Sequence, residues 1–99
     1  MRRAAKIDAN QPEIVADLRK VGCSVISLAA VGKGVPDLLV GFGTKNYLLE
    51  VKDGSKPPSA RRLTKDQVEW HRLWNGSVFT ITSTQEALDA MGIGHRGQG

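Results

Sequence analysis

Two short apolar segments, residues 37–42 and 47–52, follow each other so closely that only one kind of connection can join them. The linker between them contains Gly43, and a linker this short has no room for a crossover helix. The two segments are therefore predicted to form an antiparallel β-hairpin. This hairpin constrains the arrangement of the rest of the chain.

The register of the hairpin brings charged residues together. If its turn is centred on Gly43 and Thr44, Asp37 lies directly opposite Glu50 on the neighbouring strand. Lys52 is two residues beyond Glu50 and therefore points to the same face of the sheet. Asp37, Glu50 and Lys52 are thus predicted to converge on one site.

Two neighbouring carboxylates need compensation. At about 5 Å and an effective dielectric of about 20 they repel by about 3 kcal/mol, whereas a domain of 99 residues has a net stability on the order of 5 to 10 kcal/mol. A divalent cation such as Mg²⁺ would supply the compensation, and removal of either carboxylate should leave the metal-free fold intact. The alternative is that Asp37 follows Pro36 in a turn, while Glu50 and Lys52 form a surface ion pair.

Three helices and two further strands are predicted around the hairpin. Capping-box patterns at residues 10–13, 64–67 and 83–86 mark the helix starts, and Gly22, Gly76 and Gly92 mark their ends. The β-branched and apolar segments 24–30 and 78–82 predict the additional strands. The order is αβββαβ plus a short C-terminal helix, which is typical of an α/β fold with a mixed central sheet flanked by helices.

Length and composition limit the possible classes of protein. The 99 residues predict a single domain, with a core at about residues 7–92 and a flexible tail at 93–99. No apolar run is long enough to span a bilayer, and no apolar segment follows the basic residues 1–6, so a cytoplasmic protein is expected. Cys23 is the single cysteine, which excludes an internal disulfide and a cysteine zinc site. Any metal must be held by oxygen ligands.

Basic residues are concentrated after the hairpin. The net charge is +4, and one segment contains Lys52, Lys56, Arg61, Arg62 and Lys65 with Asp53 as its only acid up to Lys65. Residues 54–60 are predicted to form a loop, so this segment can meet a phosphate backbone. Taken alone, the segment is equally consistent with a solvated loop whose charges favour solubility.

The order of these motifs resembles a known family. Gly34-Val35-Pro36-Asp37 is followed after thirteen positions by Glu50-Val51-Lys52, and then by Leu63-Thr64-Lys65-Asp66-Gln67. Over residues 7–82 the chain resembles a VRR-NUC domain of the PD-(D/E)XK nuclease superfamily, whose small stand-alone members occur in phages and bacteria. The resemblance implies a restriction-endonuclease-like fold and Mg²⁺- or Mn²⁺-dependent cleavage of DNA, including branched DNA such as Holliday junctions, in a bacterial or phage-infected cell.

The resemblance also implies residue roles. Asp37 and Glu50 would be metal ligands together with the Val51 carbonyl, Lys52 the catalytic lysine, and Glu13 an additional acidic ligand, while Gln67 would approach the active site from its helix. Lys56, Arg61, Arg62 and Lys65 are the candidate DNA contacts. For Glu13 and Gln67, a capping box at the start of their helices is an alternative explanation.

Several features leave other interpretations open. Trp70 and Trp74 are four residues apart, which predicts an apolar stripe packed on the sheet or on another subunit, with stacking on DNA bases as the alternative. His71 is expected to be a helix-surface or interface residue. A homodimer is predicted, because resolving a two-fold symmetric junction needs two sites. Other possibilities are a non-catalytic DNA-binding or scaffold module, or a subunit of a phage recombination complex.

Overall fold

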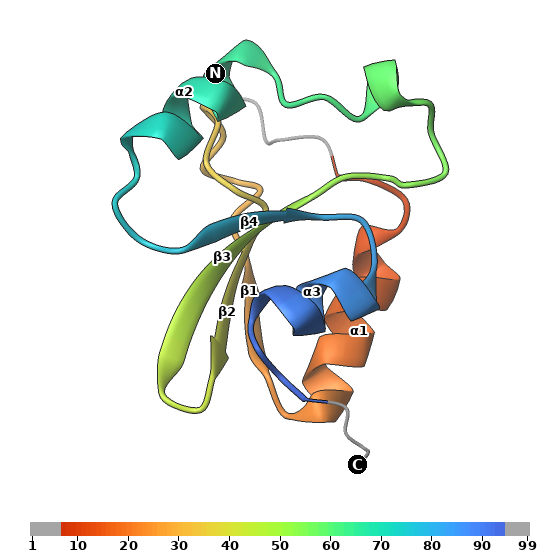
Figure 1. The fold of residues 1–99 in the computed structure, drawn as a ribbon, viewed down its shortest axis with the longest axis vertical. Coiled ribbons are helices and arrows are strands. Elements are labelled where there is room, and N and C mark those ends of the chain that lie inside the picture. Colours follow the sequence, from red (N-terminus) through yellow and green to blue (C-terminus); the bar gives the residue numbers. More distant parts are fainter. Residues whose placement is uncertain (1–6, 95–99) are drawn as a thin grey trace.

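In the computed structural model, which describes residues 7–94, a four-stranded mixed sheet is flanked by three helices (Figure 1). The elements are α1 (Gln11–Val21), β1 (Ser24–Ser27), β2 (Leu38–Phe42), β3 (Lys45–Val51), the short 3₁₀ helix η1 (Pro58–Ala60), α2 (Lys65–Leu73), β4 (Val78–Ile81) and α3 (Thr84–Ala90). This confirms the predicted α/β class and the order αβββαβ plus a C-terminal helix. Residues 1–6 and the predicted tail residues 95–99 lie outside the described part of the chain.

The strands are ordered β1-β2-β3-β4, with antiparallel pairing up to β3 and parallel pairing between β3 and β4. The predicted hairpin register is confirmed, since Leu38 pairs with Leu49 and Phe42 with Lys45. Gly43 (φ 59°) and Thr44 (φ 67°) are both left-handed, as a tight two-residue hairpin turn requires. The parallel pair is possible because α2 lies on the connection between β3 and β4.

One face of the sheet forms the core. Leu38, Val40 and Leu49 are fully buried there, and α1 and α3 cover them (Figure 1). The remaining core side chains come from the outer strands and the two helices: Ile14, Leu18, Cys23, Val25, Val51, Ile81, Ala87 and Met91. The alternating burial along β1 and β2 follows from the two-residue period of a strand.

The opposite face carries an apolar row that runs across all four strands. Ile26 pairs with Leu39, Leu39 with Leu48, and Leu48 with Val78. Ile26 is 57% exposed, and a shallow pocket beside Leu39 and Leu48 is closed on one side by Trp74. The helix α2 buries none of its residues. We refer to Ile26, Leu39, Leu48 and Val78 as the open-face row.

The tryptophans do not pack as a core stripe. Trp70 and Trp74 stack on each other, with ring centroids 4.8 Å apart and planes 19° apart. Trp74 remains 46% exposed and Leu73 62% exposed. The sheet was one of the two predicted partners of this apolar stripe, and it leaves Leu73 and Trp74 exposed.

Several element boundaries differ from the prediction, and two of them do so because the chain turns earlier. The first strand ends at Ser27 rather than residue 30, since the Val31 N–H closes a turn by donating to the Leu28 carbonyl. The second helix ends at Leu73, before Gly76. Neither change alters the topology.

The predicted capping box of α1 is absent. Asn10 has helical backbone angles and makes no side-chain cap hydrogen bond. The predicted caps of the other two helices are present: the Thr64 and Gln67 side chains form a reciprocal capping box, and the Ser83 hydroxyl accepts from the Glu86 N–H. The Glu86 carboxylate reaches back to Thr82 instead of Ser83.

Ile93, the first residue of the predicted tail, belongs to the C-terminal cap of α3. Gly92 is left-handed (φ 71°), and the Ile93 N–H donates to the Leu88 carbonyl at 2.9 Å. This pattern is a glycine C-cap in which the residue after the glycine turns back onto the helix. Ile93 accordingly packs against the core.

Candidate active site

Asp37 directly precedes β2, at a level where the neighbouring strand β3 still continues. The N–H groups of Leu48 and Lys52 donate toward the β4 side, to Ser77 and Ile81. Because N–H directions alternate along a strand, the Val51 N–H points to the β2 side of β3. Val51 lies past Leu49, which pairs with the first residue of β2. The Asp37 Oδ2 accepts this N–H at 2.7 Å, and its side chain is therefore fixed between the strands and only 6% exposed.

Glu50 is the most deeply buried charged residue of the site. It is 1% exposed and lies under α2, where Gln67 Nε2 donates to its Oε2 at 3.0 Å and His71 Nε2 lies 3.4 Å from its Oε1. Burial, a hydrogen bond with Asp37 and the negative charge of Asp37 together raise the pKa of Glu50 to about 9, with burial as the largest cause and the Lys52 charge opposing them. In the protein alone, Glu50 is therefore protonated at neutral pH.

One carboxamide connects the members of the site. The Gln67 Oε1 accepts from the Lys52 Nζ at 2.8 Å and from the Thr64 N–H at 2.9 Å, while its Nε2 donates to Glu50. The two explanations for Gln67 offered by the sequence are therefore compatible, because the side chain caps α2 and reaches the site at once. The amide orientation follows from these contacts, since one end meets donors and the other an acceptor.

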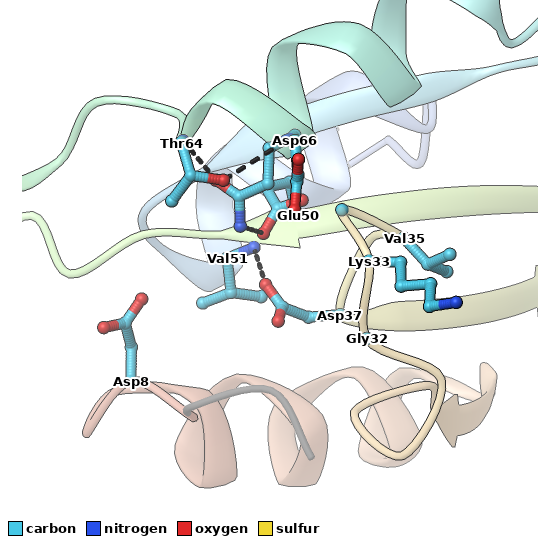
Figure 2. A pocket seen from close by; sticks show the side chains of 11 residues that line it. Asp8, Gly32, Lys33, Val35, Asp37, Glu50, Val51, Thr64 and Asp66 are labelled. Atoms are coloured by element: carbon cyan, nitrogen blue, oxygen red, sulfur yellow. Dashed lines mark hydrogen bonds between the residues drawn. The ribbon is translucent and has the colours of Figure 1, made fainter. Parts of the chain in front are cut away.

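Asp37, Glu50 and Gln67 line a cavity of about 270 Å³, whereas Lys52 and His71 are not among its lining residues. Figure 2 shows Asp37 and Val51 between Glu50, which lies under α2, and Asp8, which lies beside the start of α1. The loop of residues 32–35 and the first turn of α2 complete the wall. The negative charge of Asp8 contributes to raising the pKa of Glu50, after burial and Asp37.

The structure does not bring Glu13 to this cavity. Gln11, Ile14 and Leu18 form the buried side of α1, and Glu13 projects from its exposed side. Asp8, which precedes the helix, is the acidic residue that lines the cavity from this direction. The sequence contains no periodic signal for Asp8, because its position depends on how the chain enters α1.

His71 also lies in a different environment from the one that the sequence predicted. Its side chain is 16% exposed and faces Glu50, rather than lying on the helix surface. Burial lowers the pKa of His71, and the Lys52 charge lowers it further. The sequence does contain a signal for this position of His71. The residue follows Gln67 by four positions, which places both side chains on one face of α2.

Three of the candidate DNA-binding residues, Lys56, Arg61 and Arg62, lie on the segment between β3 and α2, and Lys65 is the first residue of α2. The Lys56 Nζ lies 3.6 Å from the Asp8 Oδ1, and the Arg61 Nε donates to the Lys56 carbonyl at 2.7 Å. Arg62 and Lys65 are exposed. Of these four residues, Lys56 is the one that approaches a carboxylate of the cavity, Asp8.

The donor atoms of the cavity suit a hard divalent cation. Within residues 7–94, no three His, Cys, Asp or Glu side chains are close enough to hold a metal by themselves. Mg²⁺ commonly takes one or two carboxylates and completes its shell with water and phosphate oxygens. Burial and the neighbouring Asp37 disfavour the charged form of Glu50, and a divalent cation bound to both carboxyl groups would favour that charged form again.

Comparison of the chain with protein-family models, with curated proteins and with solved structures finds no match. The fold and the cavity alone thus define its class: an α/β domain that buries a carboxylate pair beside a lysine and a carboxamide. No helix within the described residues is long and apolar enough to cross a membrane.

Proposed function

We propose that this protein is a divalent-metal-dependent DNA endonuclease of the PD-(D/E)XK type that hydrolyses phosphodiester bonds. The observation that carries the proposal is the arrangement around Glu50. A buried carboxyl, Glu50, is in contact with a second one, Asp37, and shares Gln67 with the Lys52 ammonium group. A domain of this size would gain stability from an apolar residue at such a position, so a buried carboxylate pair favours a chemical role.

Asp37, Glu50 and the Val51 carbonyl would hold Mg²⁺ or Mn²⁺. A bound ion of this kind polarises a phosphate oxygen and lowers the pKa of water, which supplies a nucleophile at neutral pH. Loading the site requires Glu50 to release its proton. Asp37 is already oriented to bind the ion, because the hydrogen bond that it accepts from the Val51 N–H fixes its carboxylate.

Lys52 would take part in the reaction through its ammonium group. This group donates to Gln67, which lines the cavity, and it would orient the attacking water or stabilise negative charge on the transition state. Gln67 keeps Lys52 and Glu50 at a fixed separation. Lys56, Arg61, Arg62 and Lys65 would bind the phosphate backbone beside the cavity.

We further propose that the substrate is branched DNA, such as a Holliday junction, and that the protein acts as a homodimer. Two-fold symmetric junctions require two symmetry-related sites, and each chain has one such cavity among its described residues. Within the open-face row, Ile26 is exposed and Leu39 and Val78 are half-buried, and these three would supply apolar surface for the second copy. A bacterial or phage-infected cytoplasm is the expected setting.

The test is incubation of the purified protein with labelled duplex, flap, single-stranded and four-way-junction DNA, with Mg²⁺, Mn²⁺ or EDTA. We expect cleavage with either metal, none with EDTA, and the highest rate on the junction. Glu50→Gln should abolish cleavage, whereas Glu69→Gln, which changes an exposed glutamate on α2, should cleave at the wild-type rate. Binding without cleavage under every condition would indicate a non-catalytic DNA-binding or scaffold module or a subunit that needs a recombination complex.

A further inference from the structure

Asn10 uses its side chain for something other than capping α1. Its Nδ2 donates to the carbonyl oxygen of Lys52 at 3.0 Å and to that of Thr82 at 3.1 Å. These partners are 42 and 72 residues away in the sequence. One NH₂ group therefore joins the start of α1 to two strands.

The two carbonyls lie where the parallel strands stop pairing. Val51 opposite Ile81 is the last pair of the β3–β4 ladder, and Lys52 and Thr82 are the next residues on each strand. Beyond that pair, the Lys52 N–H still donates to the Ile81 carbonyl at 2.9 Å, whereas the carbonyls of Lys52 and Thr82 accept from Asn10. The Asn10 carboxamide provides two N–H bonds from one atom, which neither a carboxylate nor a hydroxyl group can do.

This contact acts on both sides of the cavity. Lys52 is held through its backbone by Asn10 and through its ammonium group by Gln67. Asp8, two residues before Asn10, lines the cavity, and its carbonyl accepts from the Gln11 N–H at 3.0 Å. Asn10 thus fixes the turn that carries Asp8 and the strand end that carries Lys52.

We infer that Asn10 is a positioning residue of the active site, which acts by holding the backbone of Lys52 and the Asp8 turn in place. Its effect on catalysis rests on the proposed nuclease function, whereas its effect on the strand ends does not. The role is distinct from helix capping, and substitutions separate the two. Aspartate and serine cap a helix as well as asparagine does, but neither has an NH₂ group.

The experiment compares Asn10→Asp and Asn10→Ser with wild type, and uses Asn75→Asp, at an exposed loop position, as the control for the charge change. The first measurement is amide hydrogen exchange. The Lys52 N–H, which donates to Ile81, should exchange about ten-fold faster or more in both Asn10 variants, because strand ends without a partner open locally. The N–H of Val40 in the sheet centre should keep its wild-type exchange rate.

The second measurement is junction cleavage with Mg²⁺. We expect kcat to fall about ten-fold or more in both Asn10 variants while KM stays near the wild-type value, since a misplaced lysine affects the reaction more than DNA binding. Unchanged Lys52 exchange, or faster exchange with unchanged kcat, would overturn the inference. If Asn10→Asp does not fold, Asn10→Ser decides alone. A wild-type protein that cleaves nothing overturns the proposed function, and the exchange data then still test the contact itself.

Discussion

At the scale of single residues, the protonation of Glu50 has a direct consequence for stability. Burial and Asp37 raise the pKa of Glu50 in the folded protein to about 9, whereas an unfolded glutamate has a pKa of about 4.3. At a pH between these two pKa values, Glu50 is deprotonated in the unfolded chain but keeps its proton in the folded protein. The stability that this group contributes is complete below the lower value and is lost as the pH rises through the window.

We therefore expect the free energy of unfolding of the metal-free protein to fall between about pH 5 and about pH 9 relative to that of Glu50→Gln. The glutamine side chain of this variant carries no charge at any pH. The free energy of unfolding, measured with urea in EDTA at several pH values, gives the comparison. The two proteins share every other ionisable group, so their difference reports Glu50. Parallel curves would show that Glu50 ionises normally in the folded state.

Asp37 combines a structural and a chemical role. Repulsion between two carboxylates alone predicts that Asp37→Ala leaves the metal-free fold intact, but this change also leaves the buried Val51 N–H without its acceptor. We expect Asp37→Ala to lower the free energy of unfolding by about 1 to 3 kcal/mol. Asp37→Asn, which keeps an acceptor oxygen, should stay closer to wild type. Both variants should lose cleavage, and equal melting temperatures of the two would contradict the structural role.

At the scale of elements, α2 is attached to the sheet by the site itself. It buries none of its residues, and both Gln67 and His71 reach Glu50 on β3, while Gln67 also accepts from Lys52 just beyond the strand. Its first turn also touches Gly34. A Cβ at Gly34, whose φ is +83°, would lie 2.6 Å from the Asp66 carbonyl carbon.

Gly34→Ala should therefore displace α2 from the cavity. We expect cleavage to fall about ten-fold or more, because Gln67 moves with the helix. Gly43→Ala is the matched control, since Gly43 also has a positive φ (+59°) but nothing within 4 Å of an added Cβ. It should cost about 1 kcal/mol of stability and leave the cleavage rate unchanged. Equal loss of activity in both variants would mean that backbone strain, rather than contact with α2, is responsible.

The segment between β3 and α2 should control DNA affinity. Replacing Arg61 and Arg62 together with alanine should weaken binding and flatten the dependence of log K on log salt by up to about two units, since each arginine releases about one counterion. Replacing Lys20 and Lys45, which are exposed, removes the same charge outside this segment and should change the slope less. Fluorescence anisotropy over a salt series measures both. An unchanged slope in the arginine variant would make these residues solvated surface only.

The sequence predicts those elements whose signals are local. The turn at Gly43 and Thr44 sets the hairpin register, which places Asp37 opposite Glu50, and the Thr64 cap places Gln67 on the first turn of α2. Asn10 has the same local signal as Thr64 but a different structure, because the ends of two strands compete for its carboxamide. A long-range contact of this kind leaves no pattern in the sequence around it.

At the scale of the whole molecule, the two faces of the sheet differ in coverage. α1 and α3 pack on one face (Figure 1). In the open-face row on the other face, Leu48 is buried, Leu39 and Val78 are half-buried and Ile26 is exposed. The candidate active site lies at the end of this second face, since Glu50 follows Leu48 by two residues on β3. A partner that covers the row would therefore lie close to the cavity, and a second copy would bring two cavities together.

We expect the protein to form a homodimer through this face, with light scattering at low micromolar concentration giving about twice the 10.7 kDa mass of the chain. Ile26→Lys places a charge at the most exposed position of the row and should yield monomers, because the buried apolar area contributes about 25 cal/mol per Å². Val21→Lys alters an apolar residue of α1 that is 42% exposed, outside the row, and should remain dimeric. Junction cleavage by wild type should fall faster than linearly on dilution below the dimer dissociation constant, since both strands must be cut within one complex. A stable monomer that cuts junctions and linear duplex equally well would reduce the protein to a simple nicking nuclease.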